Sequence, residues 1–321
     1  MRDLLTDNFR SLSARIGADP LLIQGPGGNT SIKDDEVMWI KASGKELTDA
    51  VSSEIFVAVD RKAAAAEARG AGDGTCKATV LNPAVRLRPS IETTFHAILD
   101  WRVVVHTHSV AVLSHVVSPE GRKVAKAVLE DLNPVFVPYA KPGLPLTVAI
   151  RDRITPQTRL ILLQNHGLIV CGATTRETDH LMQQVETKLR RDLIEVHPAT
   201  PDTDPLPGFY WAGEESWLAQ DSATLARVTA GSYYPDHVVF LGPGLPVGDM
   251  ADAPPVIVVP GVGIQIRTTA TTAQRAMLRC LSDVLRRVPG DWSLQPIGPA
   301  AEAELLNWDA EKYRQRLAAK G

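Results

Sequence analysis

Two short apolar stretches that each lead into histidine constrain the fold of this chain more than any other feature of its sequence. The first spans residues 101–109 and contains Val-Val-Val-His-Thr-His. The second spans residues 159–172 and is interrupted by Gln-Asn-His-Gly. Short runs rich in Val, Leu and Ile are typical of strands buried on both faces of a sheet. The sequence therefore predicts two buried strands with histidines at a strand end or break.

The histidines of these strands are candidate metal ligands. Side chains alternate along a strand, so His106 and His108 point to the same face. His166, at the break in the second strand, is the candidate third ligand. Three protein ligands and one open position are the pattern of catalytic zinc, although imidazole also suits Mn²⁺, Co²⁺ or Fe²⁺. The alternative is three buried histidines satisfied by ordinary hydrogen bonds.

A carboxylate near the start of a predicted helix is the candidate acid/base group. Pro-Ser-Ile-Glu at residues 89–92 predicts a helix start with Ser90 as N-cap and Glu92 in the first turn. His96 lies one turn later and is expected to pack or to support the site. The helix dipole favours an acid here whether or not it is catalytic. Glu92 becomes a catalytic candidate if this helix end faces the metal.

Two turns rich in small residues are candidate anion-binding loops. They are Gly-Gly-Asn-Thr-Ser at residues 27–31 and Ala-Ser-Gly at residues 42–44, with Lys41 beside the second. Glycines let backbone N–H groups approach an anion, and hydroxyl and amide side chains add donors. The alternative is a pair of hairpin turns, for which such residues are common. Neither turn matches the P-loop pattern.

Composition excludes several classes of protein. Lys and Arg number 34 and Asp and Glu number 37, a net charge of −3 that argues against a nucleic-acid partner. The N-terminus has no apolar core of a signal peptide, and no apolar stretch is long enough to span a membrane. The three cysteines form no CxxC pair, which favours buried thiols in a reducing cytoplasm.

The rest of the chain gives weaker signals. Periodicity predicts helices over residues 3–16, 61–69, 174–193, 272–287 and 301–319, and strands over 37–40, 236–241 and 255–259. Four prolines between residues 198 and 207 indicate a linker. The Pro-Gly-Val-Gly at 260–263 lacks a third glycine and a clear helix start, so it is not interpreted as a dinucleotide fingerprint.

Six spaced motifs, taken in order, resemble the class II aldolase/adducin family. They are Gly28-Asn29-Thr-Ser31, Ile40-Lys-Ala-Ser43-Gly44, Pro89-Ser90-x-Glu92-x-x-x-His96, His106-Thr-His108-Ser109, Pro138-Tyr139-Ala-x-Pro-Gly143 and Asn165-His166-Gly167-Leu168. They cover about residues 1–195. Two later stretches, around residues 234–240 and 258–263, resemble the aldolase half of bacterial bifunctional aldolase/short-chain dehydrogenase proteins, which are similar to rhamnulose-phosphate aldolase.

The resemblance implies an α/β fold: a three-layer α/β/α sandwich around a mostly antiparallel central sheet, with a smaller α/β C-terminal extension. It implies that His106, His108 and His166 hold a divalent metal, normally zinc, and that Glu92 is the acid/base residue. It also implies a set of residues that bind the substrate or its phosphate: Gly28, Asn29, Ser43, Gly44 and Ser90. The expected domains are a catalytic domain over 1–197, a linker over 198–208 and an extension over 209–321.

The function implied by the resemblance is that of a zinc-dependent aldolase of carbohydrate metabolism. Such a lyase cleaves a C–C bond of a sugar phosphate, or of a related small hydroxy-keto or hydroxy-acid substrate, through a metal-stabilised enediolate. A decarboxylase, dehydratase or 4-epimerase of the same superfamily remains an alternative, and so does an adducin-like scaffold, although adducins lack the metal histidines that this chain keeps. Ile91 stands where sugar-phosphate aldolases commonly have a second serine, which leaves phosphorylation of the substrate open. A cytoplasmic homotetramer is expected.

Overall fold

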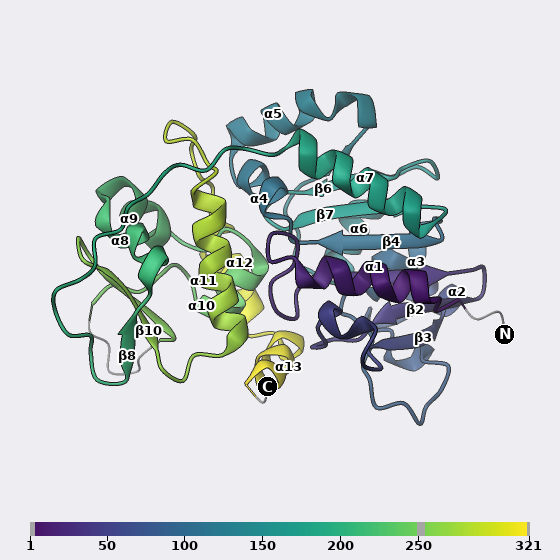
Figure 1. Cartoon of the computed structure of the whole chain (residues 1–321). Coiled ribbons are helices and arrows are strands. Elements are labelled where there is room, and N and C mark those ends of the chain that lie inside the picture. Colours follow the sequence, from purple (N-terminus) through teal and green to yellow (C-terminus); the bar gives the residue numbers. More distant parts are fainter. Residues whose placement is uncertain (1–3, 249–253, 320–321) are drawn as a thin grey trace.

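A seven-stranded sheet forms the centre of the larger part of the molecule (Figure 1). The computed structural model describes residues 4–248 and 254–319. The strands are β1 (Asn29–Lys33), β2 (Val37–Lys41), β3 (Phe56–Asp60), β4 (Val103–Thr107), β5 (Val135–Val137), β6 (Leu160–Leu163) and β7 (Gly167–Gly172). Their order is β3-β2-β1-β4-β7-β6-β5, and every neighbouring pair is antiparallel except β5 with β6. The sheet is therefore mostly antiparallel, as expected.

Helices cover both faces of this sheet. In β4, Val103 and Val105 join the hydrophobic cluster that includes α1 and α7, whereas Val104 joins the cluster that includes α3 and α6. In Figure 1, α1 and α7 cross one face of the sheet. The helices of this part are α1 (Asp7–Ala18), α2 (Arg61–Ala66), α3 (Thr93–Ile98), α4 (Val110–Val116), α5 (Pro119–Val128), α6 (Leu144–Arg151) and α7 (Thr175–Lys188). Because successive residues point to opposite faces, an all-apolar strand requires two such layers.

The C-terminal part is built on a three-stranded antiparallel sheet. It consists of β8 (Phe209–Trp211), β9 (Val256–Val259) and β10 (Gly263–Arg267), in the order β8-β10-β9. Its helices are α8 (Trp217–Gln220), α9 (Ser222–Thr229), α10 (Pro235–Leu241), α11 (Thr272–Leu285), α12 (Pro299–Leu306) and α13 (Asp309–Ala318). The Pro-Gly-Val-Gly stretch forms the β9–β10 hairpin and not a nucleotide-binding loop.

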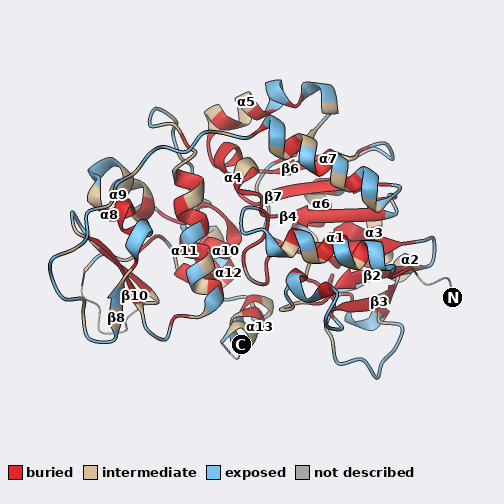
Figure 2. Ribbon diagram, in the orientation of Figure 1, coloured by how far each residue is buried: buried red, intermediate tan, exposed pale blue. Residues whose placement is uncertain are grey.

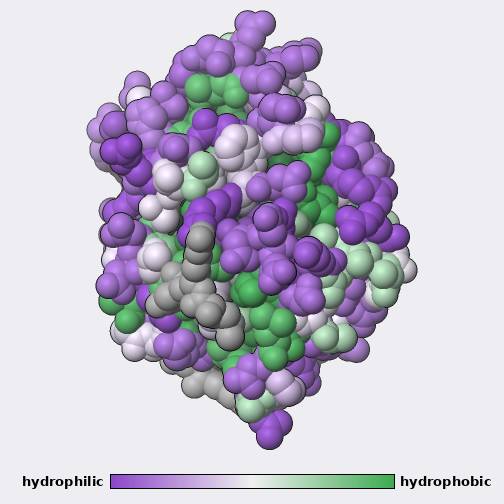
Figure 3. Space-filling model, turned by 90° about the vertical axis from the view of Figure 1, so that its right-hand side faces the viewer, coloured by the Kyte–Doolittle hydropathy of each residue, from purple (hydrophilic) through white to green (hydrophobic). Residues whose placement is uncertain are grey.

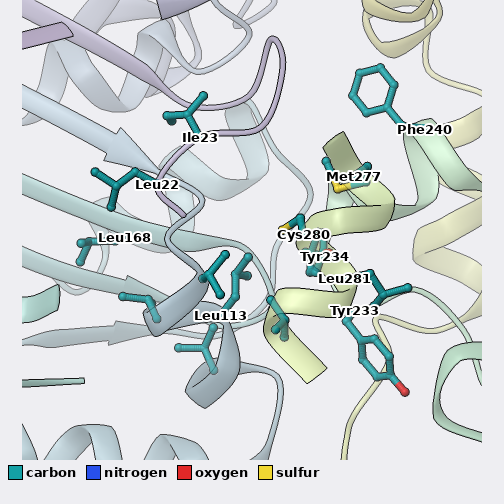
Figure 4. Packing of buried hydrophobic residues seen from close by; sticks show 14 of the residues in the cluster. Leu22, Ile23, Leu113, Leu168, Tyr233, Tyr234, Phe240, Met277, Cys280 and Leu281 are labelled. Carbon is teal, nitrogen blue, oxygen red and sulfur yellow. The ribbon is translucent and has the colours of Figure 1, made fainter. Parts of the chain in front are cut away.

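One hydrophobic core runs through both parts. Figure 4 shows Met277, Cys280 and Leu281 of α11 on the C-terminal side, with Leu113 of α4 and Leu168 of β7 on the other. All of them belong to a single cluster of buried residues. The buried residues run without a break from the large sheet into α10 and α11 (Figure 2). The C-terminal part is thus packed against the part that contains the large sheet, and the two parts share one core.

Several sequence-based boundaries are corrected by the structure. The predicted strand over residues 236–241 is wrong, because this stretch is α10. Every residue of α10 is buried, so its apolar run has no polar face that could reveal a helical period. Pro235 occupies the first helical turn, where its missing N–H costs nothing.

Three other predicted helices have ends that differ from those in the structure. The predicted helix over 301–319 is two helices, α12 and α13, separated at Asn307 and Trp308. The helix predicted from residue 3 begins at Asp7, with Thr6 as N-cap, and residue 3 lies outside the described residues. Helix α7 ends at Lys188, so residue 193 lies beyond it. Charged and polar side chains are compatible with both helix and loop, so periodicity alone places such ends poorly.

The surface and the thiols agree with the composition. Hydrophilic residues dominate the face shown in Figure 3, and hydrophobic residues form smaller patches between them. Among the residues that the structure describes, no helix combines the length and the apolar character needed to cross a bilayer. Cys76, Cys171 and Cys280 are buried free thiols, as expected.

Truncation of α11 tests the shared core. Leu281 is fully buried in the common cluster, so Leu281→Ala should lower the free energy of unfolding by about 2–5 kcal/mol. The exposed Arg275→Ala on the same helix is the matched control and should change it little. Urea denaturation followed by tryptophan fluorescence measures both. An unchanged midpoint for Leu281→Ala would show that α11 does not contribute to the core.

Candidate metal centre and active site

Three histidines meet where β4 and the β6–β7 turn end beside each other. His106 lies in β4, His108 follows it, and His166 lies in the turn before β7. One ring nitrogen from each lies within 4.8 Å of the others, and all three residues are buried. The ring centroids are 5.0–5.4 Å apart. Antiparallel pairing of β4 with β7 sets His106 opposite Ile169 and so brings the turn containing His166 to the end of β4.

The hydrogen bonds of two histidines leave their outer nitrogens free for a metal. Nδ1 of His106 lies 2.9 Å from the carbonyl oxygen of Leu168, and Nδ1 of His108 lies 3.2 Å from Oδ2 of Asp236. Each Nδ1–H therefore donates, which makes Nε2 the lone-pair nitrogen. Nε2 of His106 is buried without a hydrogen-bond partner among the described residues. Such an orphaned nitrogen fits a metal ligand.

Burial favours the neutral form of two of these imidazoles, His106 and His166. It lowers the pKa of His106, and it holds the pKa of His166 well below the ordinary histidine value, with His106 and His108 adding to the effect. A neutral imidazole is the form that binds a metal ion. A donor set of three imidazole nitrogens beside a carboxylate therefore fits a divalent first-row metal.

Glu92 faces the same point as the three histidines. Its Oε2 lies 3.5 Å from Nε2 of His106, and its Oε1 lies 3.5 Å from Nε2 of His166. Oε1 has no hydrogen-bond partner in the part of the chain that the structure describes. Helix α3 begins at Thr93, so Glu92 occupies the N-cap position and not the first turn as predicted. This position directs the carboxylate beyond the helix end and toward the histidines.

A chain of buried hydrogen bonds holds Glu92 in place. Nδ2 of Asn29 donates to Oε2 of Glu92 at 2.8 Å, and Oδ1 of Asn29 is bonded to Nε2 of His96. Nδ1 of His96 is 2.7 Å from Oγ of Ser31. Burial holds the pKa of His96 well below its ordinary value, so its ring is neutral and supports Asn29. His96 is thus a supporting residue, as the sequence predicted.

All five residues predicted to bind the substrate line one cavity of about 30 Å³ beside the histidines. They are Gly28, Asn29, Ser43, Gly44 and Ser90. A cavity of this size has room for a small polar group. His108, His166 and Glu92 line it as well, whereas His106 lies behind them. The structure therefore brings the predicted metal ligands, acid/base residue and binding turns to one place.

The two turns are fixed by close packing and by a buried lysine. A Cβ on Gly28 would lie 2.7 Å from the carbonyl oxygen of His106, and its φ of 55° favours glycine. Nζ of Lys41 donates to the carbonyl oxygens of Pro26 and Lys45 at 2.8 and 2.7 Å. Burial lowers the pKa of Lys41 to about 7. Lys41 therefore joins the two turns through their carbonyl groups and does not present a free charge to the cavity.

Sequence reasoning missed three buried charged residues from the C-terminal part. Arg314 of α13 donates to both carboxylate oxygens of Asp236, at 2.9 and 3.1 Å, and to Glu311 at 2.8 Å. Burial opposes ionisation of Asp236, but Arg314 and His108 outweigh it and hold the pKa of that carboxyl below its usual range. An ionised Asp236 accepts the Nδ1–H of His108 and fixes its ring.

Only a weak signal in the sequence marks these residues. Asp236 follows a proline in an apolar stretch, where a carboxylate needs a partner, but that stretch was interpreted as a strand. Arg314 lies in a helix whose many charges look alike in sequence. Nothing local distinguishes a buried arginine from a solvated one, so its partner across the fold was not predictable.

A second contact ties the C-terminal part to the turn that contains His166. Asn165 has a φ of 54°, a left-handed conformation that asparagine tolerates. Its Nδ2 donates to the carbonyl oxygens of Tyr233 and Gln295 at 2.9 and 2.7 Å. Residues that follow the proline-rich segment thus hold both His108, through Asp236, and the turn that contains His166, through Asn165.

Comparisons with known proteins agree with this geometry. The model of the class II aldolase and adducin N-terminal domain matches residues 13–192. The uncharacterized oxidoreductase YuxG of Bacillus subtilis is 30% identical over 205 residues, which are 57% of this chain and 29% of that protein, so the chain spans less than a third of the length of this relative.

Two solved structures are similar to the N-terminal part of this chain, and the first of them shows the same fold. The N-terminal class II aldolase domain of a conserved Thermoplasma acidophilum protein is 28% identical, with a TM-score of 0.51 over 58% of this chain and 92% of that one. An L-fuculose-1-phosphate aldolase from Thermus thermophilus is 21% identical, with a TM-score of 0.39 over 59% of this chain and 93% of that one. On the family match, which covers more than half of its residues, this chain belongs to the class II aldolase and adducin family.

Proposed function

We propose that this protein is a divalent-metal-dependent lyase that cleaves a C–C bond of a sugar phosphate or a related small hydroxy-keto substrate. The observation that carries the proposal is the convergence of three buried histidines on one point that the Glu92 carboxylate also faces. Family membership supports lyase chemistry. A metal-free structural role would leave Nε2 of His106 and Oε1 of Glu92 buried without partners, which is costly.

Each group of the site has a chemical task in this proposal. His106, His108 and His166 would hold the ion, preferably zinc, which supplies Lewis-acid polarisation of a substrate carbonyl and its neighbouring hydroxyl. Glu92 moves the proton at the carbon where the bond is broken or formed. Asn29 keeps the Glu92 carboxylate in position. The turns with Gly28, Ser43, Gly44 and Ser90 orient the rest of the substrate.

Related reactions share the same early chemistry. Decarboxylation, dehydration and 4-epimerisation also need a polarised carbonyl and a base, so each is a second candidate activity. A screen of ketose phosphates, tetronate-type acids and pyruvate-forming substrates with zinc-loaded protein separates them by product. An adducin-like scaffold is disfavoured because the three histidines are present and converge.

The cellular location, oligomeric state and domain bounds are also part of this proposal. A cytoplasmic homotetramer is expected from the family resemblance, with residues 1–197 as the catalytic domain, 198–208 as the linker and 209–321 as the C-terminal extension. Light scattering of the purified protein measures the oligomeric state.

Removal of one ligand tests the metal site. His106→Ala should lose most of the bound zinc, because two of the three imidazoles cannot hold the ion with comparable affinity. Metal analysis after zinc loading and dialysis measures it. His180→Ala, which removes an exposed histidine of α7, is the matched control and should retain the metal. Full stoichiometry in His106→Ala would contradict the ligand assignment.

Neutralising the proposed base separates binding from chemistry. Glu92→Gln keeps the shape of the side chain but removes its capacity to take a proton, so turnover should fall by about 10²–10⁴-fold while zinc is retained. Steady-state kinetics on the substrate found in the screen measures the change. Glu130→Gln, at an exposed position, is the control. Unchanged turnover in Glu92→Gln would remove this residue from the mechanism.

Loss of the buried arginine should affect both stability and metal affinity. Arg314→Met leaves the carboxylates of Asp236 and Glu311 buried without their cation, which should cost about 3–5 kcal/mol of the free energy of unfolding. Zinc affinity should weaken roughly 10–100-fold, because Asp236 no longer fixes His108. Urea denaturation and competition with a chelator measure the two effects. The exposed Arg316→Met is the control, and equal behaviour of the two variants would refute a role for Arg314.

A further inference from the structure

The small cavity beside the histidines opens onto a much larger chamber. The chamber has a volume of about 410 Å³, within the range of roughly 300–1,000 Å³ typical of small-molecule sites. The two cavities share Ser43, Ile91 and Pro142 in their walls. A molecule whose reacting carbons lie at the histidines can therefore extend its other end into the chamber.

The chamber lies between the catalytic half and the last helix. One wall comes from the segment before α3, with Arg88 and Ile91, and from the start of α6, with Leu144. The opposite wall is Trp308 and Tyr313, at and within α13. Helix α13 lies between the two parts of the molecule in Figure 1. This wall lies outside the segment matched by the family model, which ends at residue 192.

One cation in the chamber is held in position and has all its donors available. The Arg88 guanidinium carbon lies 4.0 Å from the centroid of the Tyr313 ring, which orients the group without using its N–H donors. The carbonyl of Arg88 accepts a hydrogen bond from the backbone N–H of Ser43 at 2.9 Å, which joins its backbone to the inner cavity. Within residues 4–248 and 254–319, no carboxylate lies within ion-pair distance of the Arg88 guanidinium.

Four other charged residues line the chamber, namely Lys141, Asp73, Lys77 and Asp309, and the first two are already engaged. Nζ of Lys141 lies 3.0 Å from Glu304 and over the Trp308 ring. Asp73 accepts hydrogen bonds from the backbone and the hydroxyl of Thr75, which lower the pKa of its carboxyl. Lys77 is exposed and is not held by an aromatic ring of the described residues, so Arg88 is the cation of this chamber that is both oriented and open to a ligand.

The inner cavity cannot provide an equivalent charge. Its two cations are Lys41, bonded to backbone carbonyls, and Arg314, bonded to Asp236 and Glu311. Ile91 adds an apolar side chain at the junction of the two spaces. An anionic group on the substrate, away from the reacting carbons, therefore finds its complement in the chamber.

We propose that the chamber binds the distal end of the substrate and that this end carries a phosphate or carboxylate group held by Arg88. The planar fork of an arginine suits bidentate binding of either group. Trp308 and Leu144 provide the apolar wall along which the connecting carbons lie. This inference rests on the proposed function for the placement of the reacting carbons, but the binding of an anion in the chamber is testable without any turnover.

Three probes with one carbon skeleton test the chamber. Glycerol 3-phosphate, glycerate and glycerol differ in the phosphate, the carboxylate and the absence of either, and ligand-observed NMR on zinc-loaded protein detects even weak binding. At least one anionic probe should bind and glycerol should not. Arg88→Met should weaken the anionic probe at least tenfold, and Tyr313→Leu should weaken it less, because only the orientation of the guanidinium is lost.

The controls keep the result interpretable. Arg86→Met removes an exposed arginine two residues away that does not line the chamber, and it should bind the probe like the unmodified protein. Thermal midpoints verify that all variants are folded. Binding of neither anionic probe, or equal binding in Arg88→Met, overturns the proposal. The preferred anionic probe shows whether the distal group is a phosphate or a carboxylate.

Turnover separates this inference from the proposed function. If a substrate with a distal anion is cleaved and Arg88→Met leaves its kcat/KM unchanged, the chamber proposal fails and the lyase proposal stands. If anionic probes need Arg88 but no C–C cleavage is found in the screen, the lyase proposal fails and the chamber stands.

Discussion

Burial of three imidazoles and a carboxylate at one point is the constraint on which the rest of this structure depends. Polar groups away from water need partners, and a cluster of His106, His166 and Glu92 cannot satisfy itself. The surrounding fold supplies hydrogen bonds to Nδ1 of His106 and to Oε2 of Glu92, and it leaves Nε2 of His106, Oε1 of Glu92 and Nδ1 of His166 without a partner among the described residues. A divalent cation at the centre would complete this set, which is why the geometry favours a metal enzyme over a buried polar network.

The support for this cluster comes from both ends of the chain. Asn29 on β1 and His96 on α3 hold Glu92, and both lie within the family domain. Asp236 on α10 holds His108, and Arg314 on α13 neutralises Asp236. A continuous apolar core under α11 keeps these distant segments at a fixed distance. The C-terminal part therefore supplies residues that hold the histidine cluster in place.

The same arrangement divides charge between two adjoining spaces. Close to the histidines, the side chains of Lys41 and Arg314 donate hydrogen bonds to groups of the protein itself, namely a backbone carbonyl and Asp236. Farther out, Arg88 rests on an aromatic ring with its donors available. In the proposed function, the inner cavity has room only for the reacting part of the substrate, and the larger chamber binds the distal group of the substrate. In the proposed function, substrate preference depends on Arg88 of the family domain together with Trp308 and Tyr313 of the C-terminal part.

The sequence by itself determined the family, and with it the mostly antiparallel sheet, and it grouped the three histidines; it gave no signal for strands β3 and β5. Strand periodicity put His106 and His108 on one face, and order and spacing of six motifs identified the fold, because both signals are local. The same local signals failed for residues 236–241, where uniform burial removes the helical period. Only the tertiary structure decided that Asp236 reaches His108, that Arg314 reaches Asp236 and that Tyr313 contacts Arg88. Those contacts join residues that are at least 78 positions apart in the sequence. They form because α10, α11 and α13 pack against the rest of the fold, and no short stretch of sequence encodes that packing.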